Sequence, residues 1–254
     1  MACAALVVAG PATAQEETRE PWRYRITVGP QVYPSYPGSD SYDVGPYVNI
    51  DRARGDQPFE FEAPDQGFGF SVVESGGFSI GPVVNWEGVR KAKHVGADVP
   101  TIKFSIEPGV FAGLELGESF RLRGELRKGV TGHKGWIGVA GADWVARDGD
   151  RWLFSLGPRI TWSDSRYQDA WFGITPETSV ATGLPAYDPD SGVQAVGATA
   201  SFLTEVGPNW GISAYAKYDR LVGDAADSPL VRVHGSRDQL SGGLALSYTW
   251  GGRE

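Results

Sequence analysis

The sequence predicts an all-β fold, a transmembrane antiparallel up-and-down β-barrel, on three observations. Apolar and polar side chains alternate with period two, the links between the alternating segments are short and long in turn, and tryptophan spacing matches a bilayer. The 254 residues carry 23 basic and 31 acidic side chains, a net charge of −8, which argues against nucleic acid as a partner. No apolar run approaches the roughly 20 residues of a spanning helix, so a helical membrane protein is excluded.

The N-terminus has the pattern of an export signal. A short apolar stretch within residues 2–14 ends in Ala12-Thr13-Ala14, a small-residue cleavage site. We therefore expect a signal peptide remnant over 1–14 and one outer-membrane β-barrel domain over 15–254. Cys3 is the only cysteine, so the mature chain is expected to hold neither a disulfide nor a cysteine metal site.

The alternation is clearest in residues 22–28 and 120–127. Leu122 falls on the apolar face and Arg123 on the charged face, so one side of the sheet is expected to face lipid and the other water. The other predicted strands are 43–50, 58–62, 67–73, 77–86, 101–116, 135–146, 151–162, 193–206, 209–220 and 239–250. The total is twelve if 58–62 and 67–73 are separate strands, and ten is the alternative.

The links fall into two classes. The short ones are 51–57, 74–77, 117–118, 147–150 and 207–208, and the mostly long ones are 33–42, 87–100, 163–192 and 221–238. Bacterial outer-membrane barrels show this asymmetry, with short periplasmic turns and long external loops. Both termini lie at the short-turn side only if the number of strands is even, which favours twelve.

Tryptophan spacing distinguishes a membrane barrel from a soluble one. Trp152 and Trp162 lie ten residues apart on one face, about 33 Å along a strand. With a tilt of about 40°, this becomes about 25 Å, the height of the lipid-facing band. A soluble barrel or sandwich would show the same alternation, but not the signal, loop asymmetry and girdle spacing together.

The last strand ends on aromatic side chains. Tyr248 and Trp250 close its apolar face, an arrangement that resembles the signal read by the barrel assembly machinery, although 251–254 follow it here. The alternative is an ordinary interfacial tryptophan at a strand end.

The loop 163–192 is the main candidate surface. It combines five acidic residues and one basic residue with four aromatic ones, which argues against disorder, so we expect it to fold over the barrel mouth. It is interpreted either as a plug or recognition surface or as a packed lid. The candidate residues are Asp164, Arg166, Tyr167, Asp169, Trp171, Phe172 and Tyr187, together with Asp224 and Asp227 of the next long loop.

Catalytic patterns are weak. Gly77-Phe78-Ser79-Ile80-Gly81 matches Gly-x-Ser-x-Gly, but Ser79 lies within an alternating strand instead of a strand-to-helix turn. His94, His133 and His234 lack metal-ligand spacing and are interpreted as exposed loop residues. We therefore expect no enzyme, no cofactor and no metal. The side chains expected to face the lumen are Lys103, Glu107, Arg121, Arg123, Glu125, Arg127, Arg159, Lys217 and Asp219.

Two further segments carry a family resemblance. Gly157-Pro158-Arg159-Ile160-Thr161-Trp162-Ser163-Asp164-Ser165-Arg166-Tyr167, with 171–175 and 183–187, resembles the central signature of the MipA/OmpV family, and 218–229 with 242–248 is similar to its second signature. The resemblance implies a barrel in the Gram-negative outer membrane, in contact with its lipid. It also implies a scaffold for peptidoglycan-remodelling enzymes, a murein lytic transglycosylase and a penicillin-binding protein. The alternatives are a narrow channel, a small-solute or osmotic-response protein, or an adhesin.

Overall fold

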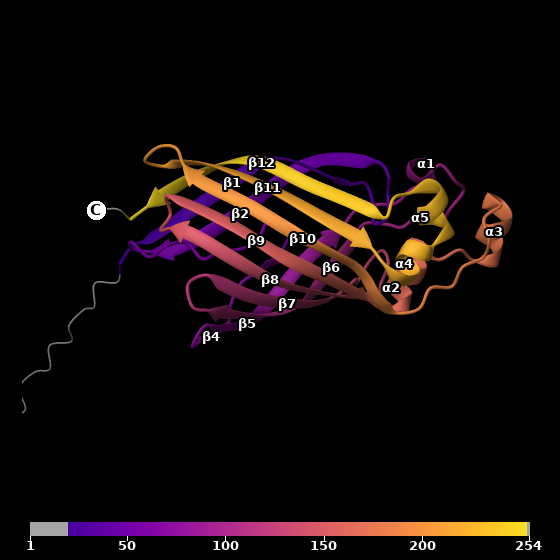
Figure 1. The fold of residues 1–254 in the computed structure, drawn as a ribbon, viewed down its shortest axis with the longest axis horizontal. Helices are drawn as coiled ribbons and strands as arrows, with labels where there is room; N and C mark the ends of the chain where they lie inside the picture. Colours follow the sequence, from indigo (N-terminus) through magenta and orange to yellow (C-terminus); the bar gives the residue numbers. More distant parts are fainter. Residues whose placement is uncertain (1–19, 253–254) are drawn as a thin grey trace, which may run out of the picture.

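The computed structural model describes residues 20–252, and the expected signal peptide at 1–14 lies outside them. Twelve strands form one antiparallel sheet that curls into a barrel (Figure 1). The strands are β1 (Trp22–Pro34), β2 (Tyr42–Arg54), β3 (Phe68–Gly69), β4 (Val73–Ser75), β5 (Phe78–Glu87), β6 (Ser105–Leu116), β7 (Phe120–Lys128), β8 (Trp136–Asp148), β9 (Trp152–Ser163), β10 (Gly192–Glu205), β11 (Trp210–Leu221) and β12 (Asp238–Gly251).

Neighbouring strands follow chain order except that β1 pairs with β12, β3 pairs with β5, and β2 does not pair with β3. The hydrogen-bonded order is β2-β1-β12-β11-β10-β9-β8-β7-β6-β5-β3, and β4 also pairs with β5. The ends of the chain are joined because β1 pairs with β12, with Tyr24 opposite Trp250 and Ile26 opposite Tyr248. The two ends of the sheet are β2 and the short strands β3 and β4.

The expected count of twelve is confirmed, but one expected strand is wrong. Residues 58–62 form no strand, and the chain from Gly55 to Gly67 instead passes through the barrel interior, where Phe59 and Phe61 are buried. Pro58 and Pro64 bracket this stretch and lack the N–H that a strand ladder needs. The expected strand 67–73 is replaced by β3 and β4.

The two rims differ as expected. Short turns join β4 to β5, β6 to β7, β8 to β9 and β10 to β11 at one rim, which also holds the C-terminal end of β12, and the long loops lie at the other (Figure 1). We call these the short-turn rim and the loop rim. The loop rim carries five short helices: α1 (Ala92–Val95), α2 (Ser165–Phe172), α3 (Pro176–Thr182), α4 (Gly223–Asp227) and α5 (Pro229–His234).

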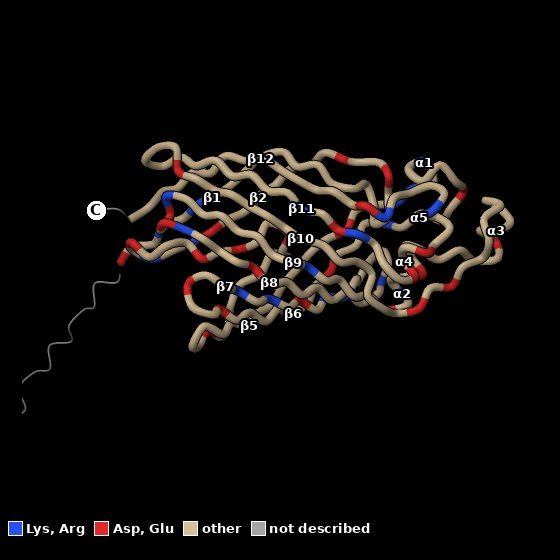
Figure 2. The backbone as a smooth tube through the Cα atoms, in the orientation of Figure 1, with Lys and Arg blue, Asp and Glu red and all other residues tan. Residues whose placement is uncertain are grey.

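The outer surface of the barrel is apolar. Leu122 is 41 % exposed and Arg123 only 8 %, so the expected facing of this strand is confirmed. In Figure 2, β10 and β12 carry charged residues only near their ends. Lys103 was wrongly expected in the lumen, since it is exposed and precedes β6. Eight of the nine tryptophans are exposed on the barrel: Trp22, Trp86, Trp136, Trp144, Trp152, Trp162, Trp210 and Trp250.

The helices of the described residues 20–252 are short. The longest, α2, has eight residues, so none of them has the length and hydropathy to cross a bilayer.

Candidate functional site in the barrel lumen and its lid

The long loops build an apolar core over the barrel mouth, which we call the lid. Trp171 and Phe172 of α2 are at most 1 % exposed, and they pack with Leu230 and Val231 of α5 and with Tyr36. The remaining buried members are Val95, Val99, Ile102, Ile137, Tyr167, Ile174, Ala195, Leu221, Ala225 and Ala226. Four of the loops at this rim therefore bury their side chains in one shared cluster.

Local sequence explains where α2 begins and where it rests. Asp164 is its N-cap, and the Asp164 carboxylate accepts a hydrogen bond from the Tyr167 amide at 2.9 Å. Gly135 lies beneath this turn, and a Cβ there would come within 2.4 Å of the Tyr167 amide nitrogen. The missing side chain at Gly135 lets α2 lie directly on the rim.

Arg90 is a component of the lid that the sequence did not indicate. The guanidinium is buried, donates to the Trp171 carbonyl at 2.6 Å and lies over the Trp171 ring. Burial lowers the pKa of Arg90 to about 10. One buried cation therefore joins the α1 loop to α2, a contact that no local sequence pattern encodes.

The nine candidate surface residues separate into two groups. Tyr167, Trp171 and Phe172 lie in the interior of the lid, so their expected place on a surface is wrong. The cause is their spacing within α2, which turns all three toward the barrel mouth. The other six keep an accessible part: Asp164, Arg166, Asp169, Tyr187, Asp224 and Asp227.

The two long loops that carry these residues are in direct contact. The Tyr187 hydroxyl donates to the Asp224 carbonyl at 2.9 Å, and the Asp224 carboxylate accepts from the Asp190 amide at 2.7 Å. Asp227 pairs with Arg232 and Arg237. Partial burial, and after it the neighbouring Asp188, raise the pKa of Asp169. The contact between these two loops therefore uses a backbone group in each of its two hydrogen bonds.

Beneath the lid the lumen is filled with ion pairs. Glu107 accepts from Arg127 at 3.1 Å and lies 2.9 Å from His133 Nε2. Arg127 also pairs with Glu125, which accepts from Arg123 at 2.9 Å. These five side chains are at most 6 % exposed. Since buried charges are tolerated when paired, the network makes the lumen a packed polar core.

The extended segment Gly55–Gly67, which we call the lumenal segment, is tied to the opposite wall. Its Asp65 accepts from Arg159 through both carboxylate oxygens, at 3.0 and 3.1 Å, and from Thr199 at 2.9 Å. Lys217 Nζ lies 3.4 Å from the Asp65 carboxylate. Arg159 fits here because its partner in β8, Gly141, has no side chain. A Cβ at Gly141 would come within 2.9 Å of the guanidinium.

Near the short-turn rim, arginines hold the start of the lumenal segment. Arg147 donates to the Phe59 carbonyl at 2.9 Å, and the Phe59 amide donates to Asp150 at 3.0 Å. The Arg23 and Arg25 guanidiniums lie 4.9 and 4.3 Å from the Phe59 ring centroid. The segment therefore has a defined position in the lumen.

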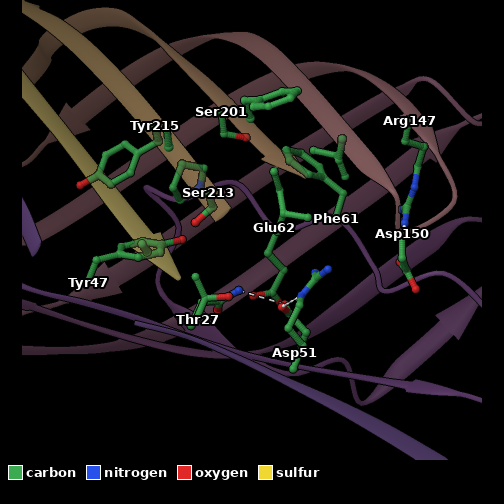
Figure 3. A pocket seen from close by; sticks show the side chains of 18 of the residues that line it. Thr27, Tyr47, Asp51, Phe61, Glu62, Arg147, Asp150, Ser201, Ser213 and Tyr215 are labelled. Carbon is green, nitrogen blue, oxygen red and sulfur yellow. Dashed lines mark hydrogen bonds and ion pairs between the residues drawn. The ribbon is translucent and has the colours of Figure 1, made fainter. Parts of the chain in front are cut away.

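A cavity of about 60 Å³ lies between the lumenal segment and the barrel wall. Figure 3 shows Phe61 and Glu62 of the segment facing this space, with Tyr47 and Tyr215 on neighbouring parts of the wall. The tyrosine rings are 5.4 Å apart. This space can hold a few water molecules or a small polar solute, and it is too narrow for a larger substrate.

The chemistry expected of single residues is partly revised. His133 is buried and its Nδ1 accepts from the Gly135 amide at 3.0 Å, so its interpretation as an exposed loop residue is wrong. Ser79 lies inside β5, without the strand-to-helix turn of a nucleophile elbow. Within residues 20–252 no three His, Cys, Asp or Glu side chains are grouped in a way that could hold a metal.

The terminal aromatics lie in a girdle at the short-turn rim. Tyr248 stacks with Trp250 at 6.3 Å and contacts Trp210 at 4.9 Å, and Trp250 stacks on Tyr24 at 5.8 Å. Their outward position fits an interfacial belt, and their recognition by the assembly machinery stays a prediction.

Comparison with known families identifies the chain. The family described as MltA-interacting protein MipA matches residues 26–250, which include all the strands except the first residues of β1 and the last of β12. The protein belongs to the MipA family. It is a β-barrel of the Gram-negative outer membrane, as expected from the sequence. A comparison with curated proteins found no match.

Solved barrels of this kind are similar only in outline to the MipA-family chain. The COG4313 outer membrane channel from Pseudomonas putida F1 has 8 % identity and a TM-score of 0.45, covering 95 % of this chain and 100 % of that one. The KdgM porin has 8 % identity and a TM-score of 0.39, with 91 and 99 % covered. The translocator domain of the autotransporter NalP from Neisseria meningitidis has 13 % identity and a TM-score of 0.35, with 94 and 90 % covered.

Proposed function

We propose that this protein is a non-enzymatic scaffold of the outer membrane that binds a lytic transglycosylase at its short-turn rim. The observation that carries the proposal is the family match over residues 26–250, since the family is described by its interaction with such an enzyme. A penicillin-binding protein is proposed as a second partner on the resemblance of residues 157–250 alone.

The filled lumen supports a scaffold over an open pore. The lid covers the barrel at the loop rim, and the lumenal segment occupies the half nearer the short-turn rim. Buried ion pairs lie between them. With such an interior, the surfaces open to a large partner are the rims. In outer-membrane barrels the short turns face the periplasm, where peptidoglycan enzymes work.

The short-turn rim offers a small charged surface. The exposed pair Arg151–Asp148 lies on the β8–β9 turn, and Arg52 and Arg54 lie over the Trp22 ring. Asp150, although on the same turn, is occupied by Arg23 and Arg147 inside the barrel, so it is not part of this surface. The partner is therefore proposed to contact the β8–β9 turn and the end of β2.

Co-purification tests the scaffold. Detergent-solubilised barrel, wild type or Arg52→Ala/Arg54→Ala/Arg151→Ala, is mixed with envelope extract, and bound lytic transglycosylase is quantified by mass spectrometry. We expect retention by the wild type and a loss of at least about tenfold in the triple variant. The matched control is Arg166→Ala/Arg232→Ala/Arg237→Ala at the loop rim, which should bind normally. Retention no greater than on an unrelated barrel of similar charge contradicts the proposal.

The second candidate function is a narrow, gated channel. It is favoured by the lumenal segment, which is a separate stretch of chain and not part of the wall. Displacement of this segment would leave a polar passage below the lid. Single-channel recordings separate the two functions, because a scaffold with a closed lumen shows no conductance steps.

A further inference from the structure

The barrel wall has an open seam between β2 and the short strands β3 and β4. Each other long strand has a hydrogen-bonded neighbour on both sides, but β2 pairs only with β1 in the part of the chain that the structure describes. β3 and β4 pair only with β5. Backbone N–H and C=O groups at membrane depth are expected to be satisfied within the protein, so an unpaired strand edge requires an explanation.

Strand direction shows what is missing at the seam. All pairs in the sheet are antiparallel, so directions alternate along the order from β2 through β1 and β12 to β5 and β3. Counted along this order, β2, β3 and β4 all run toward the short-turn rim. Direct closure would make a parallel pair, whereas one additional strand, antiparallel to both edges, continues the pattern.

The chain's own segment does not occupy this position. Chain order would place the lumenal segment there, but Phe59 is held inside by Asp150 and Arg147, and Asp65 by Arg159. No backbone hydrogen bond of the described residues joins β2 to residues 58–67. The seam therefore has room for a strand from elsewhere.

A cavity of about 700 Å³ lies at the seam, next to the short-turn rim. Ile50 and Arg52–Arg54 of β2 line one side and the residues around β4 line the other. On the membrane side, Phe70 and Phe78 are 60 and 42 % exposed. The cavity is thus bordered outside by apolar side chains and reaches inward to the lumenal segment.

The inner side of this cavity is acidic. Glu60 and Glu62 of the lumenal segment, Glu74 of β4 and Glu115 of β6 line it, and none of the four has an ion pair or side-chain hydrogen bond among the described residues. Two arginines lie on the same inner side and offset part of this charge: Arg123 pairs with Glu125, and Arg121 donates to Gln66 and interacts electrostatically with Glu60, Glu62 and Glu115. An occupant with positive charges directed inward would complement the four glutamates.

We propose that the seam binds an extended peptide segment of a partner protein, added antiparallel to β2, with basic side chains directed inward alternating with apolar side chains directed toward lipid. Strand addition supplies main-chain hydrogen bonds, and the period-two alternation places every second side chain against the glutamates. The position beside the girdle aromatics Trp22 and Tyr24 makes the site accessible from the short-turn rim. The proposal goes beyond the scaffold function and holds whether or not a transglycosylase binds.

The test uses a fluorescent eight-residue peptide of alternating Lys and Val, measured by anisotropy on the purified full barrel in detergent. An alternating Glu and Val peptide tests the sign of the charge. The Lys and Val peptide with one central Val replaced by Pro tests strand pairing, because proline cannot donate to the ladder. We expect binding of the first peptide and at least about tenfold weaker binding of the other two.

Matched barrel variants locate the site. Glu60→Gln/Glu74→Gln/Glu115→Gln is expected to weaken binding at least about tenfold, and Asp98→Asn/Glu118→Gln/Glu177→Gln, with the same change in charge, is expected to leave it unchanged. A photo-reactive version of the peptide should cross-link to residues 48–54 and 68–77. Equal binding by both variants, cross-links elsewhere, β2-to-β2 cross-links between two copies, or a co-purified lipid that the peptide does not displace would each overturn the proposal.

Discussion

The lid and the lumen are two interiors of one barrel, built in opposite ways. The lid buries aromatic and aliphatic side chains such as Trp171 and Leu230, whereas the lumen buries arginine and glutamate pairs. The lid loops stand in water and gain from the hydrophobic effect. The strands have already placed most of their apolar side chains against lipid, so period-two alternation leaves a mainly polar set for the lumen, with a few apolar side chains such as Phe111 and Val145. The surrounding solvent therefore decides what each interior contains.

The largest expected effect is the loss of the central lid residue. Trp171→Ala should destabilise the lid by about 3 to 5 kcal/mol, the usual cost of truncating a buried large aromatic side chain. Hydrogen exchange should rise across residues 164–191 while the barrel keeps its heat-modifiable mobility. Val180→Ala is the control, since Val180 is 88 % exposed on α3. Unfolding of the barrel together with the lid would show that the two interiors are not independent.

The second effect concerns the lumen. Asp65→Ala should cost about 3 kcal/mol, the low end for breaking a buried ion pair. The cost stays low because Arg159 keeps Asp143 and Lys217 keeps Asp219. The lumenal segment should loosen, and single-channel recordings should show current steps that the wild type lacks. If Asp65→Ala shows no current steps and its urea midpoint is unchanged, the lumenal segment is held mainly at Phe59.

A charge on the lipid face should have a smaller effect. Leu122 is the third residue of β7, between the short-turn rim and the midplane, so Leu122→Arg should destabilise by about 2 kcal/mol. Arg123→Leu should cost about as much or less, because Glu125 keeps Arg127 as a partner. Urea unfolding followed by tryptophan fluorescence measures both, with Leu122→Val as the control. A neutral Leu122→Arg would exclude the assigned face.

The smallest effect is a pH dependence of the lid. The pKa of Asp169 is raised in the folded lid, so ionising its carboxyl group costs more in the folded lid than in the unfolded one. The stability of the lid therefore falls as the pH rises through that pKa. Asp169→Asn should therefore slow proteolysis of the 164–191 loop at about pH 7 and leave it unchanged at about pH 3, where the wild-type group is protonated. Faster proteolysis of the variant at about pH 7 would contradict this sign.

The strands were predictable because lipid enforces a repeat of two. Trp152, Trp162 and Leu122 could be assigned to the outer face from sequence alone, and the structure places all three there. The lumenal segment has the same alternation, Phe59 and Phe61 against Glu60 and Glu62, but it is not a strand. Its position depends on Arg23, Arg147 and Asp150, partners distant in the chain that a local pattern does not contain.

The lid was predicted in place but not in detail. Composition indicated that the 163–192 loop folds over the mouth, yet the burial of Trp171 and Phe172 follows from α2, which a strand-based interpretation of the sequence did not include. Arg90 and His133 were missed for a related reason. A lone arginine or histidine in a loop gives no local sign of burial, because its partners, the Trp171 carbonyl and Glu107, come from other elements.

The pairing of β1 with β12 has a consequence for how the chain folds. The contact joins strands far apart in the sequence, so it has the greatest loop-closure cost of the strand pairs in the barrel and cannot form until β12 has been synthesised and exported. Until then both β1 and the growing end of the sheet carry unpaired edges that invite aggregation. A folding intermediate of this protein is thus expected to need protection from aggregation until β12 has paired, and a truncation within β12 is expected to leave the edge of β1 exposed.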